Sequence, residues 1–439
     1  MSGTHYELVC TLCGARHPDD GLRLDCSEPH APALLRTDYT AKTMTVQPDD
    51  GIYRYRQWLP VARSVPGAGR PAVYRSTGLG RALGLEDLWV AFSGYWPERG
   101  ADLPTGTFKD LEAFTLLGRL PEQAPTLVLA SAGNTAAAVA RACSRYRRPC
   151  LIVVPQAALP SLRFAGELDL CVRVVVLDDP ADYADAIALA DRISRLPGFV
   201  AEGGTRNVAR RDGLATAMLL AADTIGALPD CYVQAIGSGA GVLAAHEGAA
   251  RIAAATGERL PRMLACQNLP FAPVHEAWQA RSAVVRERDP LDAMRAVRAT
   301  AAGELTNRRP AYSIRGGLHD VLTATGGDVL VADNEEAREA CELFRSVEGI
   351  DVELPAGVAL AALRRAVAEG LVPSDAVTLL HVSGGGRAAL GRACASVVVE
   401  PHLRVAHGDL ESPHVTDQVL ELCADLAPSV NVPALRAER

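Results

Sequence analysis

Residues 232–241 of the chain read YVQAIGSGAG, a mostly apolar run with the length of a buried strand that leads directly into a turn with three glycines. Residues 126–135, TLVLASAGNT, have the same layout with one glycine in the turn. In both places we expect the turn to lead into a helix. Short buried strands that alternate with helices predict a parallel sheet covered by helices on both faces, so the chain is expected to have an α/β fold.

The same alternation extends through most of the chain. Further strands are expected at 88–92, 150–154, 172–177, 263–266 and 377–382. Helices are expected after residue 108 and at 136–146, 181–196, 213–225 and 416–426. A chain of 439 residues is too long for one ordinary core. We therefore expect a Cys-containing extension and arm at 1–70, a first α/β lobe at 71–205 and a second at 206–439.

Composition excludes several classes of partner. The net charge of −8 argues against a large nucleic-acid interface, which needs a basic face to replace phosphate counterions. No uninterrupted apolar run is long enough to cross a bilayer, so we expect no membrane partner. The first residues, MSGTHYELVC, lack a basic segment followed by an apolar one, so we expect no secretory signal and a cytoplasmic protein.

Lys109 is the first residue with a chemical signature. It lies in Thr105-Gly106-Thr107-Phe108-Lys109-Asp110, where a helix is expected to begin, and Lys42 is the only other lysine in the chain. The positive end of a helix dipole favours the neutral amine, which can bond covalently to an aldehyde cofactor and can accept a substrate proton. The alternative is an ordinary solvated lysine at a helix start.

Two glycine turns at strand ends are candidate anion sites, because helix N-termini present free backbone N–H groups. In the first turn, Asn134 is a candidate contact to a cofactor hydroxyl. The carboxylate of an amino-acid substrate is expected to bind at Ser131, Ala132, Gly133 and Thr135. The second turn is expected to hold a phosphate, through Gly237, Ser238, Gly239, Ala240 and Gly241. The alternatives are a tight turn capped by Thr135 and a dinucleotide-binding loop.

A third turn separates these alternatives. Ser383-Gly384-Gly385-Gly386 follows the strand expected at 377–382, and its hydroxyl suits the ring nitrogen of a pyridine. A dinucleotide site would instead need an acidic residue about 20 positions after its glycines, and it would give Lys109 no role. The order of the segments therefore predicts a pyridoxal phosphate site.

The N-terminal residues contain a candidate metal site. Cys10 and Cys13 are two residues apart, and Cys26 and His30 follow with a Cys/His spacing. This pattern is compatible with a structural Cys3His zinc site, whose four protein ligands leave no open position for chemistry. A degenerate ribbon without metal is the alternative.

Together these segments resemble the fold-type II, tryptophan synthase beta-like pyridoxal phosphate enzymes, and within them threonine synthases and, more closely, the cysteate synthase family. The likeness covers nearly the whole chain, and the blocks at 94–98 (GYWPE) and 201–213 (AEGGTRNVARRDG) favour the cysteate synthase family. The resemblance implies two open, twisted, mostly parallel sheets flanked by helices, a small N-terminal ribbon-like extension and a homodimer.

The resemblance also implies a reaction. It is a β-replacement on O-phospho-L-serine in which sulfite, a small anionic nucleophile, displaces phosphate to give L-cysteate. Lys109 would hold the cofactor, Asn134 and the loop at 237–241 would contact it, and Ser383 would lie at its ring nitrogen. Substrate would contact Thr107 and the carboxylate loop. Candidate contacts to the substrate phosphate or the sulfur oxyanion are Arg206, Arg211 and Arg387, and Asn207 is a further candidate substrate contact.

Three alternatives stay open at this point. The first is a threonine synthase acting on O-phospho-L-homoserine. The second is a β-substitution with another small nucleophile, because the sequences Thr105-Gly106-Thr107, Ser131-Ala132 and the loop at 237–241 depart from those of relatives. The third is a regulatory protein that binds pyridoxal phosphate or zinc without turnover.

Overall fold

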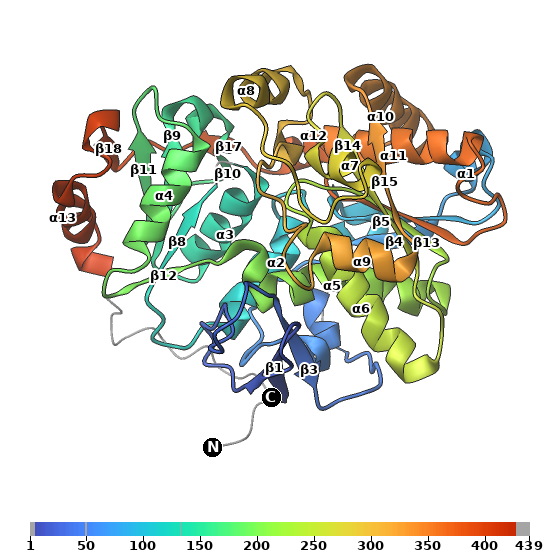
Figure 1. Ribbon diagram of the computed structural model, residues 1–439, viewed down its shortest axis with the longest axis horizontal. Coiled ribbons are helices and arrows are strands. Elements are labelled where there is room, and N and C mark those ends of the chain that lie inside the picture. Colours follow the sequence, from blue (N-terminus) through green and yellow to red (C-terminus); the bar gives the residue numbers. More distant parts are fainter. Residues whose placement is uncertain (1–4, 49–50, 132, 427–439) are drawn as a thin grey trace. The chain divides into compact units, whose positions relative to one another are not determined.

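The computed structural model describes residues 5–48, 51–131 and 133–426, which form two compact units. Unit 1 comprises Met1–Arg119 and Gly204–Cys394, and unit 2 comprises Leu120–Gly203 and Ala395–Arg439. This division differs from the expected lobes at 71–205 and 206–439. Alternation of strands and helices reveals each strand but not the sheet that it joins, and the chain passes between the units more than once (Figure 1).

Unit 1 is built on a six-stranded sheet in the order β15-β14-β13-β16-β5-β4. All neighbours are parallel except β4, which lies antiparallel to β5 at one edge. The strands are β4 (Ala72–Arg75), β5 (Leu88–Phe92), β13 (Cys231–Ala235), β14 (Arg262–Asn268), β15 (Asp328–Ala332) and β16 (Thr378–Val382). Because β5, β16 and β13 are parallel neighbours, the segments that follow them all begin at the carboxyl ends of these strands, on the same side of the sheet.

Helices cover both faces of this sheet, as the apolar strands require. Tyr232 of β13 belongs to one apolar core with α5, α6 and α9, whereas Val233 belongs to a second core with α10 and α11. Successive side chains of a strand point to opposite faces, so one strand contributes to both cores. The helices of unit 1 are α1 (Thr77–Leu83), α2 (Lys109–Arg119), α5 (Val208–Ile225), α6 (Ala240–Thr256), α7 (Pro273–Gln279), α8 (Pro290–Ala299), α9 (Leu318–Thr325), α10 (Asn334–Glu348), α11 (Leu354–Ala368) and α12 (Arg387–Ala393).

Most of helix α5 is buried. Every residue from Val208 to Ala222 is buried, including the charged residues at 210–212. It packs on α2 where Gly213 faces Leu111: a Cβ at Gly213 would overlap the Leu111 carbonyl oxygen and lie 2.6 Å from Thr115 Oγ1. The small residue therefore allows the two helices to approach closely.

Unit 2 contains a five-stranded parallel sheet in the order β12-β8-β9-β11-β18. Its strands are β8 (Thr126–Ala130), β9 (Cys150–Pro155), β11 (Val172–Leu177), β12 (Phe199–Ala201) and β18 (Leu403–Val405). The pair β10 (Arg163–Ala165) and β17 (Ser396–Val398) is antiparallel. The helices are α3 (Asn134–Arg145), α4 (Tyr183–Ile193) and α13 (Pro413–Leu422).

The N-terminal extension is a three-stranded antiparallel sheet within unit 1. Its order is β2 (Arg16–His17), β1 (Tyr6–Cys10) and β3 (Leu35–Tyr39), and a second small pair joins β6 (Tyr95–Trp96) to β7 (Ala101–Asp102). Side chains of β1 and β3 lie in the same apolar core as α5 and α6. The extension, which we call the ribbon (residues 5–39), is thus an integral part of unit 1.

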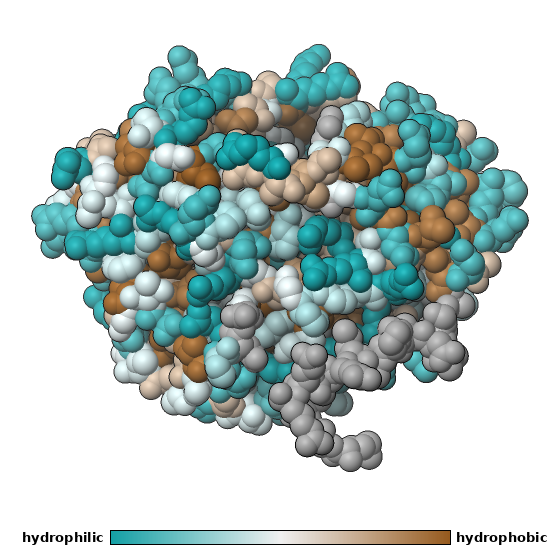
Figure 2. Space-filling model, turned by 180° about the vertical axis from the view of Figure 1, so that it is seen from behind, coloured by the Kyte–Doolittle hydropathy of each residue, from teal (hydrophilic) through white to brown (hydrophobic). Residues whose placement is uncertain are grey.

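On the face drawn in Figure 2, hydrophobic residues occur in separate groups among hydrophilic ones. Over the described ranges, no helix has both the length and the apolar character that a membrane span requires.

The predicted α/β architecture with two mostly parallel sheets is confirmed.

The close packing of α2 on α5 can be tested with two glycine substitutions. We expect Gly213→Ala to lower the free energy of unfolding by about 1–3 kcal/mol, because its Cβ would be forced into α2. Gly391→Ala in α12 is the matched control, since nothing lies within 4 Å of the added Cβ, and it should change stability by less than about 1 kcal/mol. Denaturant unfolding measures both, and equal effects would contradict the packing described for α5.

Candidate active site and metal centre

Lys109 begins α2, and the loop before it is fixed by the helix itself. The Thr105 backbone N–H and the Thr105 hydroxyl both donate to Asp110 Oδ2, at 2.7 and 2.9 Å. Asp110 is only 2 % exposed, so its carboxylate is directed back to the loop and away from solvent. The Thr107 hydroxyl accepts the Lys109 backbone N–H at 3.4 Å. The threonines of this motif therefore hold the position at which the lysine side chain leaves the helix.

The same loop is bonded to the turn that follows β16. Phe108 N–H donates to the Ser383 carbonyl at 2.9 Å, and Gly385 N–H donates to the Gly106 carbonyl at 3.0 Å. Between them, Thr107 and Gly384 form an isolated antiparallel bridge. The structure thus joins the backbones of two segments that are far apart in the sequence, and Lys109 and Ser383 lie on them.

A network of buried polar side chains lies next to this junction. His381 of β16 is bonded through Nε2 to Ser93 Oγ at 2.8 Å and through Nδ1 to the Tyr232 hydroxyl at 2.7 Å. Burial lowers the pKa of His381 to about 3, so the imidazole is neutral at physiological pH. Its ring meets Phe108 edge to face, with centroids 5.6 Å apart. The residue before Lys109 is therefore positioned by the strand that leads to Ser383.

The glycines at 237–241 form a tight turn between β13 and α6. Gly239 has a φ of +86°, a conformation that favours glycine. It is the N-cap residue of α6, so no side chain caps this helix. A Cβ at Gly237 would lie 2.8 Å from the Glu304 carbonyl oxygen, and one at Gly241 would lie 2.6 Å from Gln234 Oε1. The backbone of the turn therefore provides the N–H groups for an anion at the start of a 17-residue helix. These residues fit the phosphate of the predicted cofactor.

The Lys109 amine contacts a buried carboxylate of α2 that is itself paired with α5. Its Nζ lies 3.2 Å from Glu112 Oε2 and 4.5 Å from the centre of the Phe108 ring. Glu112 also forms an ion pair with Arg210 of α5, with Arg210 Nη2 2.9 Å from Glu112 Oε1. The sequence interpretation assigned Glu112 no role and took Arg210, together with Arg211, only as a possible anion contact. A carboxylate three residues after a lysine on an expected helix is the signal that would have found the first.

The candidate carboxylate loop belongs to unit 2 and follows β8. Gly133 caps α3 without a side-chain hydrogen bond, and its N–H donates to Ser131 Oγ at 3.4 Å. Asn134 and Thr135 are the first residues of α3, and Ala132 lies outside the described residues. The predicted order of strand, glycine turn and helix is present at this loop.

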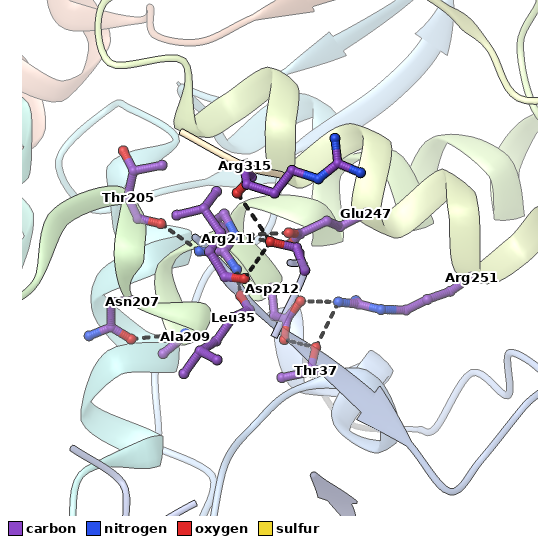
Figure 3. A network of polar contacts seen from close by, with 12 residues as sticks. Leu35, Thr37, Thr205, Asn207, Ala209, Arg211, Asp212, Glu247, Arg251 and Arg315 are labelled. Atoms are coloured by element: carbon purple, nitrogen blue, oxygen red, sulfur yellow. Dashed lines mark hydrogen bonds and ion pairs between the residues drawn. The ribbon is translucent and has the colours of Figure 1, made fainter. Parts of the chain in front are cut away.

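Arg211 occupies a buried polar network and not an open site (Figure 3). Its side chain is fully buried, and its guanidinium pairs with Glu247 at 2.9 Å and donates to the carbonyls of Thr205 and Leu35. Next to it, Asp212 accepts from the hydroxyls of Thr37 and Tyr39, both at 2.7 Å. This placement favours a structural role for Arg211, in which it links α5 to the ribbon and to α6.

The remaining candidate anion contacts also have partners. Arg206 forms an ion pair with Asp25 of the ribbon at 2.7 Å and is 43 % exposed. Asn207 caps α5 by accepting the Ala209 N–H at 3.0 Å, and it accepts Arg119 Nη1 at 2.8 Å. Arg387 donates to the Thr105 carbonyl at 2.7 Å and pairs with Glu353. Of these three, Arg387 contacts the loop that precedes Lys109.

The cysteines of the ribbon gather as the spacing predicts. One ligand atom from each of Cys10, Cys13, Cys26 and His30 lies within 4.8 Å of the others, with Cys10 Sγ 3.4 Å from His30 Nε2. Burial raises the pKa of Cys10, but hydrogen bonds from the backbone of Cys13 and Leu12 outweigh it and bring the pKa to about 7. His17 Nε2 lies 3.3 Å from Cys26 Sγ, a contact that the sequence interpretation missed. Three thiols and an imidazole form the donor set of a structural zinc site.

Comparison with known proteins defines the class. Residues 73–384 match the family model described as pyridoxal-phosphate dependent enzyme, and the chain therefore belongs to that family. Maize serine racemase has the same fold, with a TM-score of 0.55 at 19 % identity over 74 % of this chain and 91 % of that one. The threonine synthase of Escherichia coli gives a TM-score of 0.54 at 16 % identity over 77 % and 79 %.

Within this family, the chain is similar to proteins named cysteate synthase. It is 42 % identical to that of Methanosarcina barkeri over 92 % of this chain and 98 % of the relative. It is 44 % identical to that of Methanosphaerula palustris over 88 % and 91 %. The resemblance inferred from the sequence motifs is thereby confirmed.

The turn at 237–241 generates a prediction about cofactor affinity. We expect Gly239→Ala to weaken pyridoxal phosphate binding at least about tenfold, because alanine is strained at this φ and its Cβ would lie 2.8 Å from Leu318 Cγ. Gly257→Ala at the other end of α6 is the control, with a φ of +78° and nothing within 4 Å of the added Cβ. Absorbance titration with the cofactor measures both variants. Unchanged affinity in Gly239→Ala would contradict the phosphate role of this turn.

Proposed function

We propose that this protein catalyses a pyridoxal phosphate-dependent β-replacement on O-phospho-L-serine, with sulfite as the nucleophile and L-cysteate and phosphate as products. The observation that carries the proposal is the backbone junction of the Lys109 loop with the Ser383 turn, in the unit that also holds the glycine turn after β13. The similarity to proteins named cysteate synthase over nearly the whole chain supports the choice of substrates.

Each segment has a defined task in this proposal. Lys109 holds the cofactor and takes the α-proton of the substrate on its Nζ. The turn at 237–241 binds the cofactor phosphate through backbone N–H groups, and Ser383 lies at the ring nitrogen. In unit 2, Ser131, Gly133 and Thr135 bind the substrate carboxylate, and Asn134 contacts the cofactor hydroxyl. When bound, the cofactor withdraws electrons from the substrate α-carbon, which permits loss of the β-phosphate.

We propose the contacts to the substrate phosphate and the sulfur oxyanion among the candidate arginines. Arg387 is the favoured contact for the substrate phosphate or the sulfur oxyanion, because it donates to the Thr105 carbonyl and is 44 % exposed. Arg206 is a second candidate because of its charge, and Thr107 is proposed as a substrate contact on the lysine loop. Arg211 is assigned a structural role, since its guanidinium is fully buried.

A threonine synthase reaction is the second candidate for the substrate. The fold shared with the Escherichia coli threonine synthase is compatible with it, but the proteins to which this chain is similar over most of its length are named cysteate synthase. Incubation with O-phospho-L-serine and sulfite should release phosphate and form cysteate in equal amounts. Phosphate release from O-phospho-L-homoserine alone would instead support threonine synthesis, and pyruvate formation without any need for sulfite would indicate another nucleophile.

The assignment of Lys109 predicts a spectroscopic result. The purified wild type should be yellow, and borohydride should abolish the visible band, because reduction fixes the bond between the cofactor and the amine. Lys109→Ala should show no reducible band. Lys42→Ala is the matched control, since Lys42 is the only other lysine and pairs with Asp38 on the surface. A wild type that takes up no pyridoxal phosphate would overturn the proposed function.

We propose further that Cys10, Cys13, Cys26 and His30 bind one structural zinc ion. Their ligand atoms already lie close enough for a tetrahedral site, and a closed set of four protein ligands stabilises the local fold without taking part in chemistry. His17 would then donate a hydrogen bond to the Cys26 thiolate and fix its orientation.

Metal analysis tests the zinc site. We expect about one zinc per wild-type chain, and Cys26→Ser should lose the metal and unfold at a lower temperature. Cys341→Ser is the control, because Cys341 is a half-buried cysteine outside the ribbon. Metal-free wild-type protein with unchanged thermal stability would show that the ribbon folds without zinc.

A homodimer is also proposed from the family resemblance, and a cytoplasmic location stays an expectation of the sequence interpretation. Sedimentation analysis of the purified protein tests the first, and a monomer at micromolar concentration would contradict it.

A further inference from the structure

We propose that Glu112 and Arg210 are positioning residues for the reaction, and that together they set the charge of the Lys109 amine. The inference rests on the proposed function in one respect, namely that Lys109 carries the cofactor and the substrate proton. It goes beyond that function by assigning roles to two residues that neither the sequence motifs nor the relatives' names indicate.

The first observation is the burial of the carboxylate. Glu112 is 1 % exposed, and its Oε2 lies 3.2 Å from Lys109 Nζ, one helical turn away. The lysine side chain is itself only 14 % exposed. An opposite charge at this distance in a poorly hydrated site stabilises the ammonium strongly over the neutral amine. Glu112 alone would therefore keep Lys109 protonated, and a protonated amine can neither bond to an aldehyde nor accept a proton.

The second observation is the compensating charge on α5. Arg210 contacts both oxygens of Glu112, with Nη2 2.9 Å from Oε1 and Nε 3.2 Å from Oε2. Its side chain is 8 % exposed, so this two-point contact is held within the packing of α5 on α2. A bidentate guanidinium offsets part of the carboxylate's field at the lysine. The pair thus leaves Lys109 with a moderate preference for the ammonium.

The charged side chains of the neighbouring elements have partners of their own. Asp110 on the same helix is bonded to Thr105, and Arg119 at the far end of α2 pairs with Asp19 of the ribbon. From β16, His381 contributes a neutral ring that meets Phe108, and the Phe108 ring lies under the amine. On α5, Arg211 pairs with Glu247 and Asp212 pairs with Arg251.

Such a balance suits the proton transfers of the proposed reaction. Lys109 Nζ takes the proton from the substrate α-carbon, keeps it while phosphate leaves and the nucleophile adds, and returns it to the same carbon. The atom needs to be neutral before the first step and a stable ammonium between the two. Glu112 stabilises the ammonium, and Arg210 prevents that stabilisation from becoming too strong.

The two lysines of the chain allow a direct measurement. In full-length protein labelled with ¹³C at the lysine ε-carbons, NMR should show one signal for Lys42 and one for Lys109. Titration of the cofactor-free protein then gives the pKa of each amine without any assay of activity. Lys42, which is 69 % exposed and paired with Asp38, is the internal reference.

The two substitutions should act in opposite directions. We expect Glu112→Gln to lower the pKa of Lys109 by about one unit or more, because the ammonium loses its carboxylate and faces Arg210. Arg210→Gln should raise it, because Glu112 then acts without compensation, and Arg210→Lys should stay near the wild type. The visible absorbance of the cofactor-loaded proteins should show the same order in its pH midpoint.

Glu247→Gln controls for the loss of a buried ion pair. Glu247 pairs with Arg211, the neighbour of Arg210 on α5. This variant should lose stability but leave the pKa of Lys109 unchanged. If Glu112→Gln fails to fold, the rise expected in Arg210→Gln still decides the matter.

Three results would overturn the inference: no shift in either variant, shifts of the same sign, or an equal shift in Glu247→Gln. A protein that shows the opposite shifts by NMR but takes up no pyridoxal phosphate would refute the proposed function and leave the electrostatic pairing intact.

Discussion

The proposed active site depends on one set of backbone hydrogen bonds, those between the loop before α2 and the turn after β16. They join Gly106 and Phe108 to Ser383 and Gly385, so the lysine and the serine are positioned by main-chain atoms. Any side chain can be replaced in evolution, but these bonds require only that the two backbones approach. Gly384 permits the approach, because a Cβ there would lie 3.2 Å from Thr107 Cγ2 of the lysine loop.

A second constraint is the charge buried around α5. Arg210, Arg211 and Asp212 are consecutive and buried, and a buried ion without a partner costs several kcal/mol. Each therefore has a charged partner outside α5: Glu112 on α2 for Arg210, and Glu247 and Arg251 on α6 for Arg211 and Asp212. The ribbon joins the same system, since Asp19 pairs with Arg119 of α2 where both side chains are almost fully buried. The α5 charges thus fix the helices that surround Lys109.

Much of the fold and of the candidate site could be predicted from the sequence, because hydrophobic periodicity and turn chemistry depend on residues that are close together in the sequence. The strands at 88–92, 126–130 and 172–177 have the predicted bounds, and the cysteines of the ribbon lie together as their spacing indicates. The assignment of strands to sheets could not be predicted, since β5 pairs with β16 from the other end of the chain. The charge partners were missed for the same reason. Arg211 has the sequence context of an anion contact, but only the fold shows that Glu247 and two carbonyls surround it.

The account rests on Lys109 as the residue that carries pyridoxal phosphate. Borohydride reduction of the cofactor-loaded protein, followed by mass-spectrometric mapping of peptides, tests this claim most directly because only two lysines can carry the adduct. The account predicts one reduced cofactor per chain, on the peptide that contains Lys109. An adduct on Lys42, or no adduct in protein saturated with pyridoxal phosphate, would contradict it.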